Sequence, residues 1–567
     1  MQNYYSRIAP SLLTIIEFFL LAAAGLLILF FSVFPSGRKH PAAFRRIEIG
    51  FERLARRQTL AVLLVGLSVI ATRLTLIPIL GVPRPGIHDE FSYLLAADTF
   101  AHGRLTNPTH PMWVHFESFH VIQKPTYMSI YPPAQGLVLA AGQLMGGPWI
   151  GQVVITALMC AALCWMLQGW LPPPWAFFGA MMAVLRLGIL SYWMNGYWAA
   201  SIVALGGALV LGAWPRLRKQ LRVRDALLMS LGLAILAASR PYEGLVFSIP
   251  VAFAMAFWLL GRNRPAFSRS LPDVVLPILL SLLVAATALS YYHYRVTGNP
   301  FRMAYQVNAE TYAAAPLFIW QTPRPEVAYR HEAIRDFYSW EMTEFEKNRT
   351  FPGFLRRSLE KFISSWQFYV GPLLTLPLLV ILPVARRHKM VLALLICCSL
   401  AGGLALETWS LPHYFAPATG ALYLLMVGGV RQLWHWAPRQ RPVGRALVRA
   451  IPLLACAMII LRLTAAAAHV QIEPVWPRGN LQRAAIMRQL QQLPGQHLVI
   501  VSYGPTHNRD REWVYNSADI DGAKTVWARD MGTAENQELF RYFKSRSVWR
   551  VNGDDSSPWP RPYEAPH

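Results

Sequence analysis

Apolar runs long enough to cross a lipid bilayer recur along most of this 567-residue chain. A helix needs about 20 apolar residues to span roughly 30 Å of hydrocarbon. Only 15% of the residues are charged and 54% are hydrophobic, whereas a soluble domain carries about 25% charged residues. The chain is therefore predicted to be an all-α polytopic membrane protein.

Twelve membrane spans are expected. The first, Ser11 to Phe34, is too long for a signal peptide and lacks a small-residue cleavage site, so we interpret it as a retained span. The segment from Ala134 to Gly147 is too short to span comfortably, and we interpret it as re-entrant or interfacial. The other eleven spans are expected near 59–80, 150–171, 174–190, 191–214, 225–240, 244–260, 271–292, 366–384, 390–407, 413–430 and 449–467.

Basic residues indicate the orientation of these spans. Glu48 and Glu52 are the only acids in five short loops that together hold 23 Lys and Arg residues: 35–58, 215–224, 261–270, 385–389 and 431–449. Short basic loops face the cytoplasm, and with twelve spans all five fall on one side. Nearly the whole net charge of +23 is thus a topology signal, and a nucleic-acid partner is not indicated.

This orientation divides the chain into three parts. Residues 1–58 are an extra N-terminal span with a basic cytoplasmic loop, and residues 59–467 form the main transmembrane module. Two loops of that module, 81–133 and 293–365, are expected on the outer, periplasmic side of the inner membrane. The third part is the tail, 468–567, on the same outer side.

Secondary structure is also predicted outside the membrane. An amphipathic helix is expected around Glu326 to Lys347, within the second outer loop. In the tail, His497 to Ser502 and Thr525 to Ala528 have strand character, and Glu535 to Ser545 has helix character. The tail is therefore predicted to be a small C-terminal α/β soluble domain.

The first outer loop contains two adjacent carboxylates, Asp89 and Glu90, shortly after a predicted span. Apolar residues at helical spacing follow them, which predicts a helix on the outer membrane surface with Asp89 at the water–lipid boundary. A structural role is the alternative, because an Asp in a first helical turn satisfies free N–H groups and complements the helix dipole. The local sequence leaves both interpretations open.

Three short motifs resemble the C-type (GT-C) integral-membrane glycosyltransferases, which include the protein O-mannosyltransferases and the lipid A aminoarabinose transferases. They are His88-Asp89-Glu90, Lys124-Pro125 with Tyr131-Pro132-Pro133, and Leu411-Pro412-His413-Tyr414. The resemblance covers about residues 59–467 in architecture, but only these stretches in motif. Aminoarabinose transferases have an Arg close behind the Asp-Glu pair, whereas Phe91 and Ser92 follow it here, and the first span is also unusual for the family.

The resemblance implies a sugar donor linked to polyprenyl phosphate and a lipid, glycan or protein acceptor. Phosphate is a good leaving group, so one base is sufficient for an inverting displacement. Asp89 is expected to be that base. Glu90 is expected to orient Asp89 or the acceptor, with a solvated neighbour as the alternative.

Further residues are expected to surround the donor. The leaving phosphate needs cationic or hydrogen-bonding partners, and those expected are Lys124, Arg240, His413 and Tyr414. For Arg240 the alternative is a loop Arg paired with Glu243. Residues expected to line the sugar or acceptor are His88, Tyr131, Tyr192, Trp193, Asn195 and Tyr197. For the aromatic residues of 192–198 the alternative is an interfacial belt.

Two questions stay open at this level. The first outer loop holds His88, His102, His110, His115 and His120, and one of these could join Asp89 on a divalent metal such as Mg or Mn, although the spacing matches no standard zinc motif. No other cofactor is indicated. The alternative function is a multi-span transporter or flippase of a lipid-linked or anionic substrate, but the charged residues within spans lie mostly near their ends, whereas transporters place them near the midplane.

Overall fold

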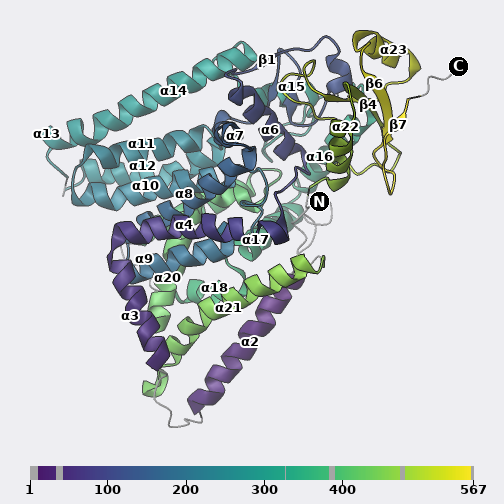
Figure 1. Ribbon diagram of the computed structural model, residues 1–567. Coiled ribbons are helices and arrows are strands. Elements are labelled where there is room, and N and C mark those ends of the chain that lie inside the picture. Colours follow the sequence, from purple (N-terminus) through teal and green to yellow (C-terminus); the bar gives the residue numbers. More distant parts are fainter. Residues whose placement is uncertain are drawn as a thin grey trace.

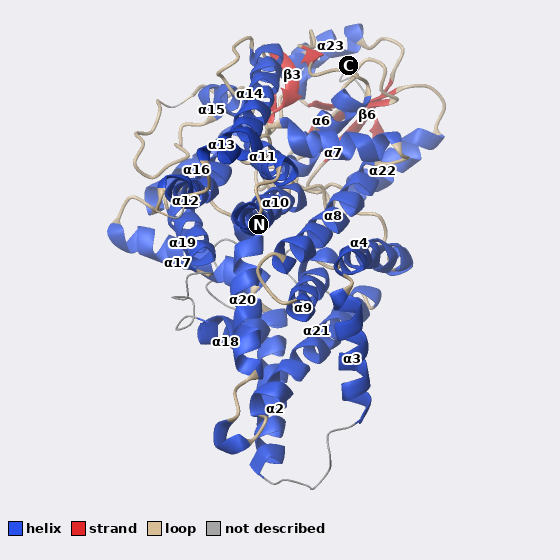
Figure 2. Ribbon diagram, turned by 90° about the vertical axis from the view of Figure 1, so that its left-hand side faces the viewer, coloured by secondary structure: helices blue, strands red, loops and turns tan. Residues whose placement is uncertain are grey.

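The computed structural model describes residues 11–33, 42–262, 264–325, 327–381, 390–470, 472 and 479–563. Most of the chain is helical, and the strands gather at one end of the molecule (Figure 1, Figure 2). The helices before residue 300 are α2 (Leu12–Val33), α3 (Ala42–Arg56), α4 (Gln58–Thr75), α5 (Ile77–Leu80), α6 (His88–Ala101), α7 (Pro133–Leu144), α8 (Pro148–Gln168), α9 (Pro173–Ala183), α10 (Ala200–Lys219), α11 (Val223–Ala237), α12 (Pro241–Leu260), α13 (Phe267–Ser270) and α14 (Leu276–Thr297). Those after it are α15 (Ala304–Tyr312), α16 (Glu332–Lys347), α17 (Phe351–Tyr369), α18 (Gly371–Ile381), α19 (Val391–Ala405), α20 (Thr419–Trp434), α21 (Val443–Ala467), α22 (Leu481–Gln492) and α23 (Thr533–Tyr542).

Six helices among the described residues are long and apolar enough to cross a membrane. They are α4, α8, α10, α12, α13 with α14 as one continuous helix of 31 residues, and α21. Helices α17 and α18 would add a seventh as a broken span, since they bend by 103° at their junction. The expected number of twelve is not confirmed, because several predicted spans form helices shorter than 18 residues.

The predicted spans 174–190 and 191–214 show why some helices are shorter than the spans predicted for them. Helix α9 ends at Ala183, a π-helical turn covers Val184–Gly188, and α10 begins only at Ala200. Buried polar side chains bond the free carbonyls between them: Trp149 Nε1 donates to the Met194 carbonyl at 3.0 Å, and Asn195 Nδ2 donates to the Ile189 carbonyl at 2.9 Å. Non-helical backbone is tolerated at membrane depth only when protein groups satisfy it in this way.

The segment 134–147, expected to be re-entrant or interfacial, is largely the 12-residue helix α7. It lies against α6 on one side and α8 on the other. Glycines permit this close packing: a Cβ on Gly136 would meet the Ala96 Cβ at 2.7 Å, and one on Gly151 would meet the Val138 carbonyl oxygen at 2.2 Å. Helix α7 therefore supports the helix that carries Asp89.

The first span, α2, packs along α18 and α21. Its buried Glu17 pairs with Arg186 at 3.1 Å and accepts a hydrogen bond from the Leu373 N–H at 3.0 Å. The basic loop that follows contains the amphipathic helix α3, whose Glu48 binds Arg449 at 2.8 Å. Charged residues in and beside the apolar helices thus bind one another across the bundle.

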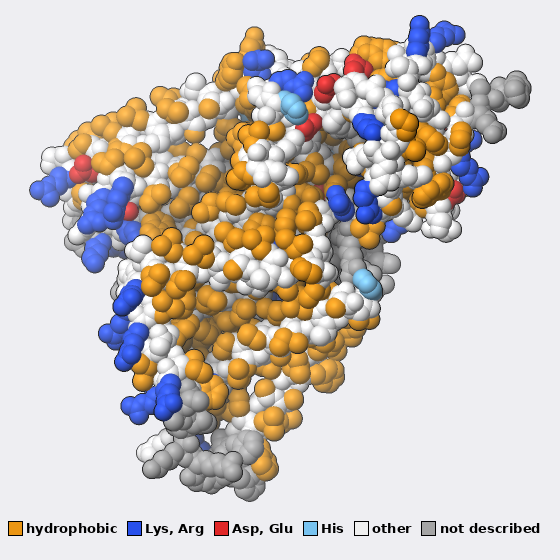
Figure 3. Space-filling view, in the orientation of Figure 1, with side chains coloured by type: hydrophobic (Ala, Val, Ile, Leu, Met, Phe, Trp, Pro, Cys, Tyr) orange, Lys and Arg blue, Asp and Glu red, His pale blue; other side chains and the backbone are white. Residues whose placement is uncertain are grey.

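Lys and Arg side chains form one group at the left-hand side of the molecule, over α13 and along α3, and others lie over the tail at the right (Figure 3). The left-hand group is on the side away from the C-terminal sheet (Figure 1). The expected cytoplasmic loops 215–224 and 431–449 join α10 to α11 and α20 to α21 at this side. The loop 385–389 lies outside the described residues.

The tail contains the predicted strands and helix. Strands β4 (His497–Ser502) and β5 (Thr525–Arg529) are confirmed, and α23 begins two residues before the predicted helix. The strands β6 (Ser547–Asn552) and β7 (Arg561–Pro562) complete a sheet of order β5-β4-β6-β7, in which β4 is parallel to β5 and β6.

The tail does not stand apart from the first outer loop. That loop forms its own small sheet of order β1-β3-β2, from β1 (Asn107–Pro108), β2 (Val121–Ile122) and β3 (Thr126–Ser129). Phe91 and Leu95 of α6 share a hydrophobic core with Leu498 and Ile500 of β4. The Phe91 and Tyr515 rings stack at 4.3 Å, so α6 is held between the tail and α7 instead of lying on a membrane surface.

Candidate active site

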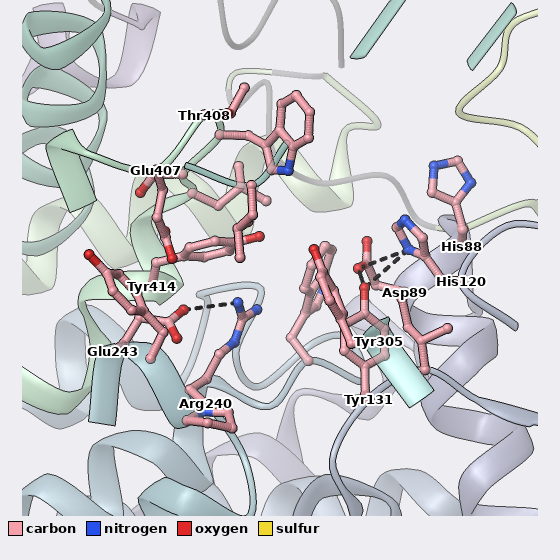
Figure 4. A pocket seen from close by; sticks show the side chains of 18 of the residues that line it. His88, Asp89, His120, Tyr131, Arg240, Glu243, Tyr305, Glu407, Thr408 and Tyr414 are labelled. Atoms are coloured by element: carbon pink, nitrogen blue, oxygen red, sulfur yellow. Dashed lines mark hydrogen bonds and ion pairs between the residues drawn. The ribbon is translucent and has the colours of Figure 1, made fainter. Parts of the chain in front are cut away.

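A cavity of about 260 Å³ lies where the helical bundle meets the first outer loop and the tail (Figure 4). Its walls come from the start of α6, the segment 130–132 that follows β3, the start of α12, helices α15, α16 and α17, and the segment 407–411. Five of the residues expected at the site line this cavity: His88, Asp89, Tyr131, Arg240 and Tyr414.

Asp89 faces the cavity from the first turn of α6. The residue at the helix N-cap is Ile87, and it makes no side-chain capping bond. The Oδ1 atom of Asp89 instead accepts a hydrogen bond from the Tyr131 hydroxyl and lies 3.2 Å from His120 Nδ1. Asp89 therefore belongs to a side-chain network in the cavity, which a capping role would not require.

The surroundings of Asp89 favour its ionised form. Burial alone would raise the pKa of Asp89, but the adjacent His120 ring lowers it, and the net pKa is about 2. His120 is itself fixed, since its carbonyl accepts a hydrogen bond from Ser92 Oγ at 2.6 Å. The carboxylate is thus a stable anion at neutral pH.

Glu90 points away from the cavity and is 5% exposed. Its carboxyl group accepts hydrogen bonds from the Gly86 N–H at 2.9 Å and the Tyr197 N–H at 3.1 Å. Burial raises the pKa of Glu90 to about 7, against the lowering effect of these donors. Glu90 is therefore neither a solvated neighbour nor a lining residue; it ties α6 to the segment before α10.

Arg240 precedes α12 and faces Asp89 across the cavity (Figure 4). Its Nη1 donates to Glu243 Oε1 at 3.1 Å, and its guanidinium carbon lies 4.0 Å from the centre of the Tyr414 ring. Arg240 thus lines the cavity, as expected of a phosphate partner, and it also forms the pair with Glu243 that was the alternative interpretation. The Glu243 carboxylate orients the Arg240 guanidinium toward the open space.

His413 lies beside the cavity but does not line it. It is 1% exposed, its Nδ1 is 3.1 Å from the Tyr192 hydroxyl, and the Trp198 ring covers it at 4.7 Å. Of the expected aromatic cluster, Tyr192, Trp193, Asn195 and Tyr197 are buried behind the cavity wall, and Trp198 lines it. These side chains hold the non-helical segment before α10 instead of forming an exposed belt.

Lys124 is placed away from the cavity. It is exposed, and its Nζ lies 4.3 Å from the centre of the Trp113 ring. The cause is the β2–β3 hairpin, whose open end carries His120 and Tyr131 at the cavity, while Lys124 occupies the turn. At roughly 3.3 Å per residue the turn lies about 13 Å from that end.

The cavity also contains charged residues that the sequence analysis did not single out. Lys361 Nζ donates to the Leu404 carbonyl at 3.1 Å and to that of Glu407, and Arg357 binds Glu344 and Glu360. The remaining charged lining residues missed are Glu341 and Asp510. The sequence did contain a signal for Arg357 and Lys361. Lys and Arg are usually concentrated in cytoplasmic loops, so their presence beside a span on the outer side is unusual.

Few potential metal ligands lie close together among the described residues. No group of three or more His, Cys, Asp or Glu side chains among them is arranged to hold an ion. Asp89 and His120 supply two such groups, while His110 binds Asp521 at 3.1 Å and His102 lies 3.5 Å from Asp98. Mg²⁺ at a phosphate site is usually held by one or two carboxylates together with the phosphate, so a divalent metal beside Asp89 stays a prediction, and we derive no step through it.

No protein-family model and no curated protein matches this sequence. Among solved structures, apo ArnT from Cupriavidus metallidurans aligns with a TM-score of 0.51 at 13% identity, over 86% of this chain and 92% of that one. ArnT is a membrane glycosyltransferase of the GT-C superfamily. This chain has the GT-C fold.

Two further structures with the GT-C fold also align. ArnT bound to undecaprenyl phosphate gives a TM-score of 0.49 at 12% identity, over 86% of this chain and 92% of that one. The apo oligosaccharyltransferase of Archaeoglobus fulgidus gives 0.45 at 13% identity, over 78% of this chain, which spans 62% of that longer protein. The GT-C fold and the apolar helices together make this chain an integral membrane protein.

Proposed function

We propose that this protein is a glycosyltransferase that moves a sugar from a polyprenyl phosphate to an acceptor on the periplasmic face of the inner membrane. The observation that carries the proposal is the cavity itself, in which the ionised Asp89 faces Arg240 (Figure 4). ArnT, whose fold this chain shares, binds undecaprenyl phosphate. A carboxylate opposite a cation is what a proton-accepting base and a leaving phosphate require.

Asp89 is the proposed base. Among the described residues, the side chains of Tyr131 and His120 contact Oδ1 of Asp89, so Oδ2 is the oxygen proposed to meet the acceptor. Asp89 takes the proton of the acceptor hydroxyl while the acceptor oxygen bonds to the anomeric carbon. The bond from that carbon to the phosphate oxygen breaks with its electron pair on the phosphate, which inverts the anomeric configuration.

Arg240, Tyr414 and Lys361 are the proposed phosphate partners. All three line the cavity, and each can donate to a phosphate oxygen. Lys361 replaces Lys124 in this role, because Lys124 lies outside the cavity. His413 is proposed to position Tyr192 and Trp198 behind the wall instead of contacting the phosphate.

The deciding variant is Asp89→Asn in the full-length protein. An amide keeps the shape of the side chain but cannot accept a proton, so transfer should fall by about 10²–10⁴-fold. Transfer is followed by mass spectrometry of envelope glycolipids and glycoproteins from cells lacking the native gene and complemented with each variant. The purified variant should still bind undecaprenyl phosphate, measured by thermal stabilisation.

Asp555→Asn is the matched control, because Asp555 is an exposed acid in the tail and does not line the cavity. It should leave both readouts at wild-type level. Near-normal transfer by a folded Asp89→Asn protein would exclude Asp89 as the base. An unchanged set of envelope glycans in cells without the gene would count against the proposed reaction as a whole.

A further inference from the structure

The first span carries a buried carboxylate that the proposed reaction does not use. Glu17 interrupts the apolar stretch of α2 and is 4% exposed. Burying a carboxylate among apolar helices is costly unless other groups compensate its charge. The groups that do so, the Arg186 guanidinium and the Leu373 N–H, lie 169 and 356 residues further along the chain. A charge kept at this cost indicates that these contacts have a function.

Glu17 and Arg186 meet at the bend between α17 and α18. Arg186 Nε donates to the Phe368 carbonyl at 2.9 Å, and Arg186 Nη2 donates to the Gln367 carbonyl, both in the last turn of α17. Glu17 Oε1 accepts from the Leu373 N–H at 3.0 Å, in the first turn of α18. Such groups at helix ends have no partner within their own helix, and the two charges also complement the helix dipoles. The ion pair therefore fixes the 103° bend.

Gly371 shows how closely the ion pair fits into the bend. Its φ of +58° lies in the left-handed region, which favours glycine. A Cβ on Gly371 would lie 2.5 Å from Arg186 Nη2 and 2.8 Å from Glu17 Oε1. Across the bend, Trp366 Nε1 donates to Thr375 Oγ1 at 2.9 Å. A change in the angle between the two helices would therefore disturb the ion pair.

Helix α17 connects this bend to the candidate active site. The residues of α17 that line the cavity are Arg357, Glu360, Lys361 and Ser364. Its opposite face is apolar and exposed, at Phe351, Leu355, Leu359 and Phe362. Protein thus supports α17 on the cavity side and at its carboxyl end, where the ion pair lies. At 1.5 Å per residue Lys361 is about 10 Å from that end, so a tilt of about 10° would move its backbone by about 1.7 Å.

We propose that Glu17 and Arg186 are positioning residues for the donor phosphate, which act through α17 on Lys361. The additional first span thereby has a function, because it supplies the carboxylate that sets the direction of α17 and the place of a phosphate partner in the cavity. This inference rests on the proposed function, since it takes Lys361 as a phosphate partner.

The test measures equilibrium binding of radiolabelled undecaprenyl phosphate to the full-length protein in detergent micelles. Glu17→Gln removes the charge but keeps an acceptor for the Leu373 N–H. It should weaken binding by about threefold or more, the range found for residues coupled through one network. Glu48→Gln is the matched control: it makes the same substitution in the Glu48–Arg449 pair, away from α17, and should bind like wild type.

Gly371→Ala tests the bend without removing either charge. The added Cβ would strike both members of the ion pair, so this variant should also weaken binding. Gly298→Ala is its control, because Gly298 has a left-handed φ of +80° as well, but a Cβ there meets nothing within 4 Å. It should bind like wild type.

A double-mutant cycle separates positioning from a general loss of structure. In a Lys361→Ala protein, Glu17→Gln and Gly371→Ala should have no further effect on binding, because the residue on which they act is gone. Equal weakening in both backgrounds, or wild-type binding by both variants of the bend, would overturn the positioning role. So would equal weakening by the two controls.

Two results with other proteins of the same series separate this inference from the proposed function. Normal binding by Lys361→Ala, when the wild type binds, would overturn the positioning role alone. A wild-type protein that does not bind undecaprenyl phosphate would refute the proposed function, and the positioning role with it.

Discussion

At the residue scale, Asp89 and Glu90 are neighbours with opposite electrostatic states. Successive residues of an α-helix point about 100° apart, because 3.6 residues complete a turn. Asp89 therefore faces the cavity and has a pKa of about 2, while Glu90 faces the protein interior and has a pKa of about 7. At neutral pH the side chain of Asp89 is ionised in the resting protein, whereas the side chain of Glu90 gains or loses a proton near that pH.

This difference predicts a pH dependence of stability. The folded-state pKa of Glu90 is raised by burial, so its contribution is fully present below its ordinary pKa of 4.5 and is lost as pH rises through about 7. The loss approaches about 3 kcal/mol, from roughly 1.4 kcal/mol per pKa unit. Thermal unfolding in detergent between pH 4.5 and 8 should show wild-type protein losing stability relative to Glu90→Gln. Parallel curves for the two proteins would contradict the buried, proton-binding state of Glu90.

Two lysines allow a matched test of the phosphate assignment. Lys361→Ala should weaken binding of undecaprenyl phosphate by about tenfold or more, because a hydrogen bond to a charged group contributes about 1.5–3 kcal/mol. Lys124→Ala removes the same charge from outside the cavity and should leave binding unchanged. Thermal stabilisation titrated with undecaprenyl phosphate measures both. If Lys124→Ala weakens binding and Lys361→Ala does not, the phosphate lies elsewhere.

Only some residues of the candidate site could be predicted from the sequence, and Lys124 and Lys361 illustrate why. Asp89 was expected because a pair of carboxylates follows a predicted span, and Tyr414 was expected from the Leu411-Pro412-His413-Tyr414 stretch of the family resemblance. Arg240 was expected because Lys and Arg are sparse on the outer side. Lys124 satisfied the same reasoning, but a hairpin turn carries it away, and hairpin direction depends on tertiary packing. Asp510 could not be anticipated, because nothing local indicates that the tail folds against α16.

At the scale of elements, the stack of α6, α7 and α8 positions Asp89. A Cβ on Gly151 would lie 2.2 Å from the Val138 carbonyl oxygen, which belongs to the backbone of α7 and can move only with its helix. Helix length was the least predictable feature of these elements. Buried side chains can donate hydrogen bonds to backbone carbonyl groups where a helix ends, and this leaves no sign in the hydropathy of the sequence. The long spans, with no such interruption, were predicted well.

Gly151→Ala should therefore displace α7 and, through it, α6. Overpacking of this kind costs about 1–3 kcal/mol of stability, and a shift of about 1 Å at the base can slow transfer by about 10²-fold. Gly147→Ala is the control, since a Cβ there meets nothing within 4 Å. Thermal unfolding and the envelope-glycan assay measure the two effects, and equal behaviour of the two variants would show that α7 does not position Asp89.

At the scale of the whole molecule, the segregation of charge predicts which side each end faces. Single cysteines at His102 and Ser517, both exposed on the side of the tail, should react with a membrane-impermeant maleimide in intact spheroplasts. A cysteine at exposed Lys219 should react only after the membrane is permeabilised. The exposed native cysteines, Cys398 and Cys456, are first replaced by alanine. Labelling of Lys219→Cys in intact spheroplasts would invert the topology and move the cavity to the cytoplasmic side.

The core shared by α6 and the tail also has a consequence for biosynthesis. The Ala518 N–H donates to Asp98 Oδ2 at 2.8 Å, across 420 residues of chain. A ribosome adding about 5–20 residues per second needs roughly 20–80 s to make that length. During this time α6 has emerged but lacks the partner that covers Phe91 and completes the cavity wall with Asp510. Under the proposed function and orientation, a newly made chain is therefore expected to be inactive until its last segment has been exported, so that translocation itself would control when activity begins.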